Sequence, residues 1–310
     1  MKKQMFEPAP IKLTIESPQT FRDIVFNDAY AKEEVFIGYG NPSAKILIVG
    51  QEMTWRKDTD QKNEYKVYSK RNIADWRKNL QQKEVQQTEV TIQGDIQHPE
   101  DGVTTEAYER FNPLYPHYLR FNKKLYIRNK DWHTSNYGAS STWIHYQQLI
   151  DSIYNRPAPK PKIIDFVTNC FITELSKETR PHNIEVDENL SKEDKEKEIK
   201  KQAEATEKSI AKRCHLLNEP FFQNFPIIIL ACGQYASKIL PYTFGLGKDF
   251  KKELFESKGG YKVFKTNDRI VIWTRQLSDH RGNPVKPELI TAIANEVRPY
   301  RDKATQTSKR

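Results

Sequence analysis

Polar and ionisable side chains follow or interrupt the apolar runs of this sequence, and these are the groups that could carry out chemistry. A carboxylate, Glu52, comes directly after the run that ends at Gly50, and an amide, Asn169, lies in the segment "NCFIT". A carboxylate can orient or deprotonate water, and an amide offers both a hydrogen-bond donor and an acceptor. A third segment, "LSDHRG" from Leu277, places a bare leucine among groups that bind phosphates. We expect a functional site where these segments come together.

Four apolar runs must position these groups. Continuous apolar runs bounded by Pro, Gly or polar residues are typical of buried strands, whereas a spacing of three to four residues indicates helices. Strands that alternate with helices predict a parallel sheet with helices on both faces, where ligands bind at the carboxyl ends of the strands. We predict strands within 43–50, 163–172, 225–233 and 261–274, and helices within 21–31, 73–80, 143–153 and 185–213.

Length and composition predict one elaborated α/β domain. The chain has 310 residues, of which 37% are hydrophobic and 29% charged, so it can bury a core and still carry much solvated surface. The segments 55–115 and 182–213 are very polar, and we interpret them as insertions into the domain 1–310. The segment 298–310 is a basic C-terminal tail, which either contacts a ligand or is simply solvated.

Several functional classes are disfavoured. No apolar run reaches the length of a membrane span, and the N-terminus lacks the apolar segment of a signal peptide, so we expect a cytoplasmic protein without membrane contact. The three cysteines form no C-x-x-C pair and the seven histidines are scattered, so we expect neither disulfides nor a metal site. The glycines of "GYGNP" precede a strand, whereas a dinucleotide fingerprint follows one, and no phosphate-binding loop motif is present.

The net charge favours a polyanionic partner. The formal charge is +9 at pH 7, and basic proteins gain affinity for nucleic acids through the release of counterions. The charge therefore favours a nucleic acid as the partner.

The order of the pieces resembles the uracil-DNA glycosylase superfamily. In its best-known branch the first strand ends in G-Q-D-P-Y and a middle strand in L-L-N-x-x-L-T. A third strand reads like F-L-L-W-G, and the last strand and loop give H-P-S-P-L-S-x-H/Y-R-G. The resemblance covers roughly 35–54 and 160–290, and Glu52 stands where the family has its catalytic Asp. The matching residues are Gly50, Gln51, Asn169, Thr173, Ile229, Leu230, Gly233, Leu277, Ser278, His280, Arg281 and Gly282.

The resemblance implies a three-layer α/β/α sandwich with a central, mostly parallel sheet of about four strands. It also implies that a base leaves the DNA stack before it is attacked, and that an apolar wedge fills the space it vacates. Glu52 would then act on water, and Leu277 would be the wedge. The resemblance places Gln51, Asn169, Thr54 and Trp273 around the base, and Ser278, His280 and Arg281 on the DNA backbone.

Each of these roles has a structural alternative. Leu277 can pack inward on the sheet, Asn169 can close a turn at a strand end, and Glu52 can bind strand-end amides. The chain also departs from the family pattern at Thr274 and Gln276, where the family has Pro, and at two positions that bear on the chemistry. Thr54 stands where the family has a Tyr that excludes thymine, and Trp273 stands where it has its catalytic His. An indole N–H donates a hydrogen bond but does not exchange a proton as an imidazole does.

The expected function is base excision in DNA repair. We expect a DNA glycosylase, a hydrolase that cleaves the N-glycosidic bond of a damaged or uracil-like base without a metal or other cofactor. The first alternative is a non-catalytic nucleic-acid-binding member of the same superfamily that has lost the catalytic histidine. The second is a hydrolase of free nucleosides or modified nucleotides.

Overall fold

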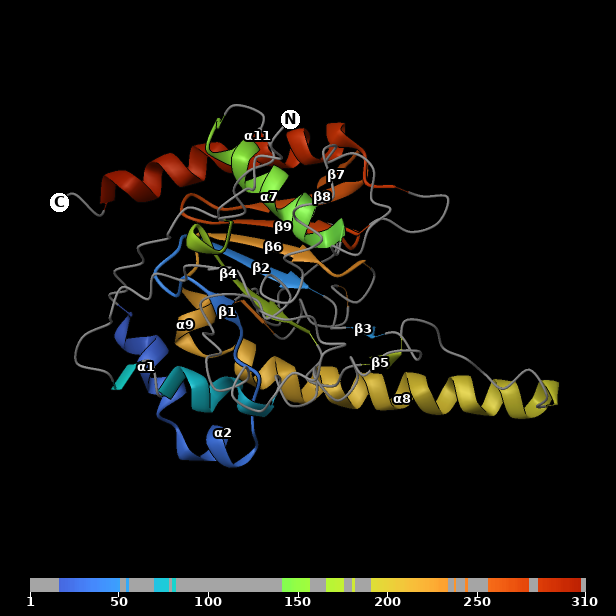
Figure 1. Ribbon diagram of the computed structural model, residues 1–310. Coiled ribbons are helices and arrows are strands. Elements are labelled where there is room, and N and C mark those ends of the chain that lie inside the picture. Colours follow the sequence, from blue (N-terminus) through green and yellow to red (C-terminus); the bar gives the residue numbers. More distant parts are fainter. Residues whose placement is uncertain are drawn as a thin grey trace, which may run out of the picture.

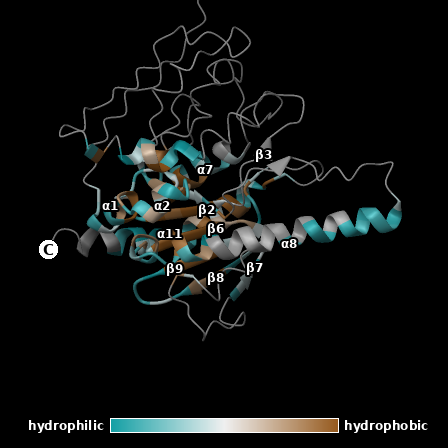
Figure 2. Ribbon diagram, turned by 90° about the horizontal axis from the view of Figure 1, so that it is seen from below, coloured by the Kyte–Doolittle hydropathy of each residue, from teal (hydrophilic) through white to brown (hydrophobic). Residues whose placement is uncertain are grey.

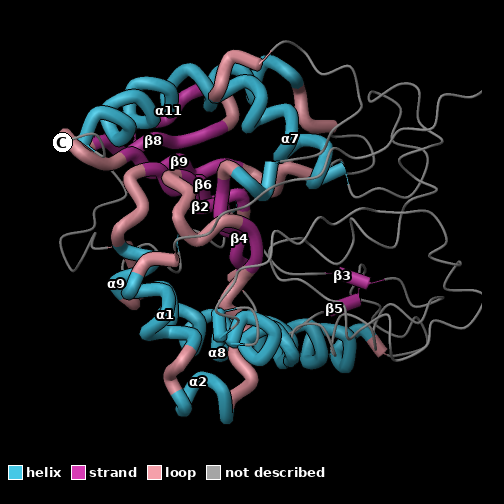
Figure 3. Tube along the Cα trace, turned by 60° about the vertical axis from the view of Figure 1, so that its left-hand side comes forward, coloured by secondary structure: helices cyan, strands magenta, loops and turns pink. Residues whose placement is uncertain are grey.

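The protein has an α/β fold built around one large mixed sheet (Figures 1 and 3). The α/β class predicted from the alternation of patterns is therefore confirmed. The computed structural model describes residues 17–50, 54–55, 70–77, 80–81, 141–156, 166–175, 180–181, 191–233, 237, 243–244, 256–278 and 284–307.

Four parallel strands form the centre of the sheet, one for each predicted apolar run. They are β2 (Ile46–Gly50), β4 (Cys170–Glu174), β6 (Ile227–Ala231) and β9 (Ile270–Thr274), and they lie in the order β4-β2-β6-β9. Residues of all four are almost entirely buried, which matches the near-continuous apolar sequences of strands covered on both faces.

The sheet is larger and more mixed than the predicted sheet of about four strands. It has seven strands, because β1 (Tyr39–Gly40) adds antiparallel to β4 at one edge. At the other edge β8 (Tyr261–Lys265) and β7 (Glu256–Lys258) continue antiparallel from β9. A separate pair, β3 (Thr54–Trp55) and β5 (Arg180–Pro181), runs parallel.

Helices lie on both sides of the sheet (Figure 1). On one side lie α7 (Ser141–Ile153) and α11 (Pro287–Thr307), which pack against each other. On the other side lie α1 (Gln19–Val25), α2 (Asp28–Lys32) and α9 (Pro220–Gln223), together with the end of α8 (Lys192–Leu217).

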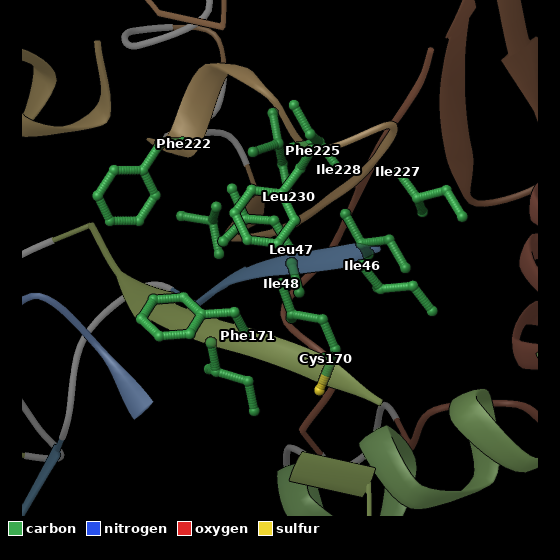
Figure 4. Packing of buried hydrophobic residues seen from close by; sticks show 14 of the residues in the cluster. Ile46, Leu47, Ile48, Cys170, Phe171, Phe222, Phe225, Ile227, Ile228 and Leu230 are labelled. Atoms are coloured by element: carbon green, nitrogen blue, oxygen red, sulfur yellow. The ribbon is translucent and has the colours of Figure 1, made fainter. Parts of the chain in front are cut away.

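Aromatic side chains fill the second of these interfaces. Phe171 of β4 lies 5.1 Å from Phe221 and 5.6 Å from Phe21, measured between ring centroids, in edge-to-face arrangements. Edge-to-face pairs add attraction beyond the burial of their area. Figure 4 shows Phe171, Phe222 and Phe225 gathered over the aliphatic side chains of β2 and β6.

Both predicted insertions contribute to the core. Residues 70–77 are helical, as predicted, and Trp76 and Asn72 are fully buried. The Asn72 side chain accepts hydrogen bonds from Ile37 and Gly38 amides and donates to the Gly38 carbonyl. The charged start of α8 extends away from the sheet (Figures 1 and 2), but near its end Arg213, Cys214, Leu216 and Leu217 are buried.

The predicted basic tail is helical up to Thr307, as part of α11. Arg298 donates two hydrogen bonds to the Ser152 carbonyl, at 3.0 and 2.6 Å, and Arg301 donates to the Ile153 carbonyl. These carbonyls end α7, where cations offset the negative end of the helix dipole. The two arginines therefore bind the protein's own backbone. Within the described ranges, no helix is long and apolar enough to cross a membrane.

Candidate functional site at the carboxyl edge of the sheet

The strand order creates a switch point between β2 and β6. From β2 the chain goes to β4 on one side. From β6 it goes to the other side, to β7 at the far edge, and returns through β8 to β9. In open α/β sheets ligands bind beyond the carboxyl ends of the strands where the order reverses in this way. The four parallel strands end at Gly50, Glu174, Ala231 and Thr274. The pairing register places these four residues level with one another along the strand direction.

A buried carboxylate lies against the end of β2. Glu174 pairs with Gly50 in the parallel register, and its side chain is 7% exposed. A Cβ built on Gly50 would collide with Oε2 of Glu174 and lie 2.9 Å from Oε1. The Tyr39 hydroxyl lies 3.5 Å from Oε1. Glycine at position 50 thus gives the Glu174 carboxylate room at the point where the segment Gln51–Glu52 begins.

A buried guanidinium holds the end of β4 from the other side of the sheet. Arg213 of α8 donates to the Glu174 carbonyl at 2.7 Å, to the Thr173 hydroxyl and to the Phe36 carbonyl. Burial lowers the pKa of Arg213 to about 9, although Glu174 and Tyr30 act to raise it. The group stays charged at neutral pH, so it fixes the β4 end through charge-assisted hydrogen bonds.

The ends of β6 and β9 are joined through an indole. Trp273 is partly buried, and its Nε1–H donates to the Gly233 carbonyl at 2.7 Å. The Lys262 ammonium lies 4.6 Å from the centroid of the Trp273 ring, in cation–π geometry. Gly233 adopts a positive φ of 58°, and no atom lies within 4 Å of the place a Cβ would take.

The segment that follows β9 is fixed at three points. Leu277 is completely buried within the core, and its carbonyl oxygen lies 3.2 Å from Nδ1 of His145. Arg275 donates to the Ser278 carbonyl at 3.4 Å and to the Pro284 carbonyl at 3.5 Å. These contacts fix the backbone of residues 275–278 at the carboxyl end of β9.

The position of Leu277 disagrees with the expected wedge and agrees with inward packing. An exposed leucine loses the favourable free energy of burial, about 1.5–3 kcal/mol for a full side chain. With 0% of Leu277 exposed, this leucine anchors the segment to the core and is not available to a base stack in this conformation.

Asn169 lies at the amino ends of the parallel strands, whereas Gly50 lies at their carboxyl ends. The predicted strand 163–172 begins only at Cys170, because Phe166–Thr168 forms a 3₁₀ turn whose Phe166 amide donates to the Gln147 side chain. Asn169 therefore precedes β4, roughly 16 Å along the strand from Glu174 at ~3.3 Å per residue. Its amide donates to the Thr168 hydroxyl at 2.6 Å, so it forms part of a turn.

The remaining predicted site residues divide into two groups. Thr54 opens β3 in the small separate sheet, and Ser278 lies partly buried in the segment after β9. The other predicted residues lie outside the described part of the chain, namely Gln51, Glu52, His280 and Arg281.

Two ionisable residues of α7 lie against the sheet. His145 is buried beside Leu277, and the next residue, Tyr146, is buried with its ring 6.0 Å from that of Phe166, which precedes β4. Burial raises the pKa of Tyr146, and the Glu174 carboxylate raises it further, so both groups share one environment. Among the described residues, no three His, Cys, Asp or Glu side chains gather as a metal site requires.

Sequence patterns missed Glu174, Arg213 and His145. Glu174 follows the "NCFIT" segment directly, but the family pattern ends at Thr173, so Glu174 was not singled out. Arg213 and His145 lie on helices, where spacing predicts the apolar face but not which polar residue enters the core.

Comparisons with protein-family models, with curated proteins and with solved structures found no match to this chain.

Proposed function

We propose that this protein is a DNA base-excision glycosylase with a three-layer α/β/α sandwich of the uracil-DNA glycosylase type. The observation that carries the proposal is the adjacency of β2, β6 and β9 in the sheet. The motif-like residues follow these three strands in the sequence. Their common carboxyl edge includes the switch point, the usual place for a ligand in such sheets.

In this proposal a flipped nucleotide occupies the edge between β2 and β6. Glu52 orients a water molecule and accepts its proton as the water attacks C1′ of the sugar, while the bond from C1′ to the base breaks. A carboxylate also stabilises the positive charge that develops on the sugar. Gln51 contributes hydrogen bonds to the base. Asn169 and Leu277 have no role, because of their positions at the opposite edge and in the core.

Oligonucleotides that carry a single uracil, hypoxanthine or oxidised base test the proposal. The wild type is expected to leave alkali-labile abasic sites in at least one of them. Glu52→Gln is expected to lower the single-turnover rate by about 10²–10⁴-fold, the usual contribution of a general base. The matched control is Glu204→Gln, at an exposed position of α8, with an unchanged rate. An E52Q variant as fast as the wild type contradicts the assigned role.

A specific observation favours the non-catalytic alternative. The indole N–H of Trp273, at the position of the family's catalytic histidine, is occupied by the Gly233 carbonyl. A protein that binds DNA and cleaves no base of the panel is a binding module. A protein that fails to bind DNA even at low salt contradicts both functions.

A further inference from the structure

We propose that Glu174 reads the flipped base and gives the site a preference for guanine-type bases, which present two adjacent N–H donors. This inference rests on the proposed glycosylase function and names the class of base on which it acts. Four parallel strands end at this edge of the sheet, and only β4 ends in an ionisable residue, Glu174. A carboxylate therefore lies where such a sheet binds its ligand.

The Glu174 carboxylate reaches across the end of β2, toward the switch point. Strand β2 lies between β4 and β6, and Gly50 is the residue of β2 that is level with Glu174. A Cβ on Gly50 would lie 2.8 Å from Cδ of Glu174 and 2.9 Å from its Oε1, so the carboxylate occupies the side-chain space of position 50. Both oxygens are thus brought to the strand that borders the switch point.

The surroundings hold this carboxylate in place and favour its ionised form. Arg213 donates to the Glu174 carbonyl at 2.7 Å, and the Tyr39 hydroxyl lies 3.5 Å from Oε1. The charge of Glu174 acts to raise the pKa of Arg213, so the two groups attract each other, and the guanidinium favours the ionised carboxylate in turn. The Glu174 side chain is buried, so a hydrogen bond to it is made in a medium of low dielectric constant, where it is strong.

An ionised carboxylate accepts hydrogen bonds and donates none. Its two oxygens have about four acceptor positions, so one carboxylate can make contacts within the protein and also accept two bonds from a ligand. A pair of parallel N–H···O bonds to a carboxylate adds geometric specificity as well as affinity. A base that fits Glu174 therefore presents two neighbouring N–H donors.

Guanine-type bases have this pattern, and adenine and uracil lack it. On the Watson–Crick edge of guanine, N1–H and the 2-amino group are adjacent donors. Adenine has its 6-amino donor beside the acceptor N1, and uracil has a single N3–H between two carbonyl oxygens. These acceptors would face the carboxylate oxygens, and a site that leaves buried polar groups unpaired rejects a base strongly. Because a flipped base is read on its Watson–Crick edge, Glu174 favours modified guanines.

Two oxidised purines with the same lesion isolate the edge that Glu174 reads. 8-Oxoguanine and 8-oxoadenine are oxidised at the same ring position and differ in their Watson–Crick edges. Single-turnover rates are measured on oligonucleotides that contain 8-oxoguanine, 8-oxoadenine or uracil, together with the melting temperature of each variant. Glu174→Gln replaces one acceptor by a donor, whereas Glu174→Asp keeps both acceptors on a shorter side chain. The matched control is Glu204→Gln, at an exposed position of α8.

The wild type is expected to cleave 8-oxoguanine at least about 10²-fold faster than 8-oxoadenine or uracil. E174Q is expected to slow the cleavage of 8-oxoguanine by about 10- to 100-fold, the contribution of a hydrogen bond to a charged group. The same variant is expected to cleave 8-oxoadenine faster than the wild type does, because a carboxamide pairs with one donor and one acceptor. E174D is expected to keep the preference for 8-oxoguanine, and E204Q to match the wild type on all three bases.

The outcomes separate this inference from the function on which it rests. A wild type that cleaves uracil but neither oxidised purine keeps the glycosylase function and overturns the inference. Equal losses of E174Q on both purines mean that Glu174 only supports the end of β2, which also overturns it. Should E174Q fail to fold, the same decision falls to E174D, which must retain the preference for 8-oxoguanine. A wild type that cleaves none of the three bases contradicts the glycosylase function on these bases, and the inference with it.

Discussion

At the scale of single residues, the end of β2 is shaped by a contact between backbone and carboxylate. Gly50 and Glu174 face each other in register, and the Glu174 side chain occupies the space that any other residue at position 50 would need for its Cβ. Because the segment with Gln51 and Glu52 starts at this point, the two residues together set where that segment leaves the sheet.

Gly50→Ala is expected to destabilise the protein by displacing the Glu174 carboxylate, at a cost of about 1–3 kcal/mol for overpacking. Truncation of Glu174 to Ala opens the space, so G50A should cost less in the E174A background. A double-mutant cycle in urea measures this coupling. The control is Gly259→Ala, where no atom lies within 4 Å of the new Cβ. Additive effects of G50A and E174A would contradict the close contact.

Single residues also show the limit of what the sequence predicts about the site. The sequence singles out Leu277 and Asn169, but it does not show where their side chains point. A loop can turn either face of a leucine-containing segment toward the core. The start of β4 is decided by the tertiary contact between Phe166 and Gln147, which no local pattern contains.

At the scale of elements, one buried side chain near the end of α8 binds the end of β4 through hydrogen bonds. Arg213 reaches three acceptors on two separate segments, the carbonyls of Phe36 and Glu174 and the hydroxyl of Thr173. Arg213 donates to these acceptors from three separate nitrogens, Nε, Nη1 and Nη2, whereas a lysine ammonium at the same position has a single nitrogen.

Arg213→Lys is therefore expected to lower the free energy of unfolding by about 2–4 kcal/mol, because it leaves buried acceptors unpaired. Lys200→Arg, an exposed change on the same helix, is expected to shift it by less than about 0.5 kcal/mol. Chemical denaturation of both variants provides the measurement. An R213K variant as stable as the wild type would show that water or another side chain replaces the lost donors.

The hairpin of β7 and β8 is attached to α11 by a carboxylate. Glu296 accepts hydrogen bonds from Lys258, at 2.8 Å, and from Lys265. Burial acts to raise the pKa of Glu296, but the two lysines outweigh it, and the pKa is lowered from its usual value. The folded protein therefore holds this carboxyl ionised more strongly than the unfolded chain does.

The stability contributed by Glu296 is expected to depend on pH. Because the folded pKa is lowered, the contribution is fully present above the pKa of an unfolded glutamate, near 4.5, and is lost as pH falls through the folded value. Glu296→Gln should thus be less stable than the wild type at pH 7 by up to about 1 kcal/mol. The difference should disappear in acid, as urea titrations at several pH values can measure. A constant difference across pH would contradict the assignment.

Sequence patterns predicted the elements with long apolar runs and missed those without them. β2, β6 and β9 lie within the predicted runs, because strands buried on both faces need continuous apolar sequence. β1 and β7 lie at the two edges of the sheet and have only two and three residues. Strands this short cannot show a repeating apolar pattern. The helical state of the basic segment after Arg298 was also not predicted, because its anchoring to α7 is a long-range contact.

At the scale of the whole molecule, the strand order and the placement of charge define the candidate site. The order β4-β2-β6-β9 cannot be read from the sequence, since each connection could have turned to either side. The net charge of +9 is a property of the sequence, but the structure decides which cations are available to a ligand. Arg213, Arg298 and Arg301 donate to backbone carbonyls, whereas Lys262 lies beside Trp273 near the carboxyl edge.

Binding to DNA is therefore expected to depend steeply on salt, with the contributing charges at the carboxyl edge. The wild-type affinity should fall by at least about 10²-fold between about 50 and about 200 mM salt, as counterion release requires for several phosphate contacts. Lys262→Met should reduce the slope of log affinity against log salt by about one phosphate contact. Lys200→Met, on the part of α8 that extends away from the sheet, should leave the slope unchanged. Fluorescence anisotropy with a labelled oligonucleotide measures both slopes. If K200M flattened the slope and K262M did not, DNA would lie along α8, and the carboxyl edge would not be the binding site.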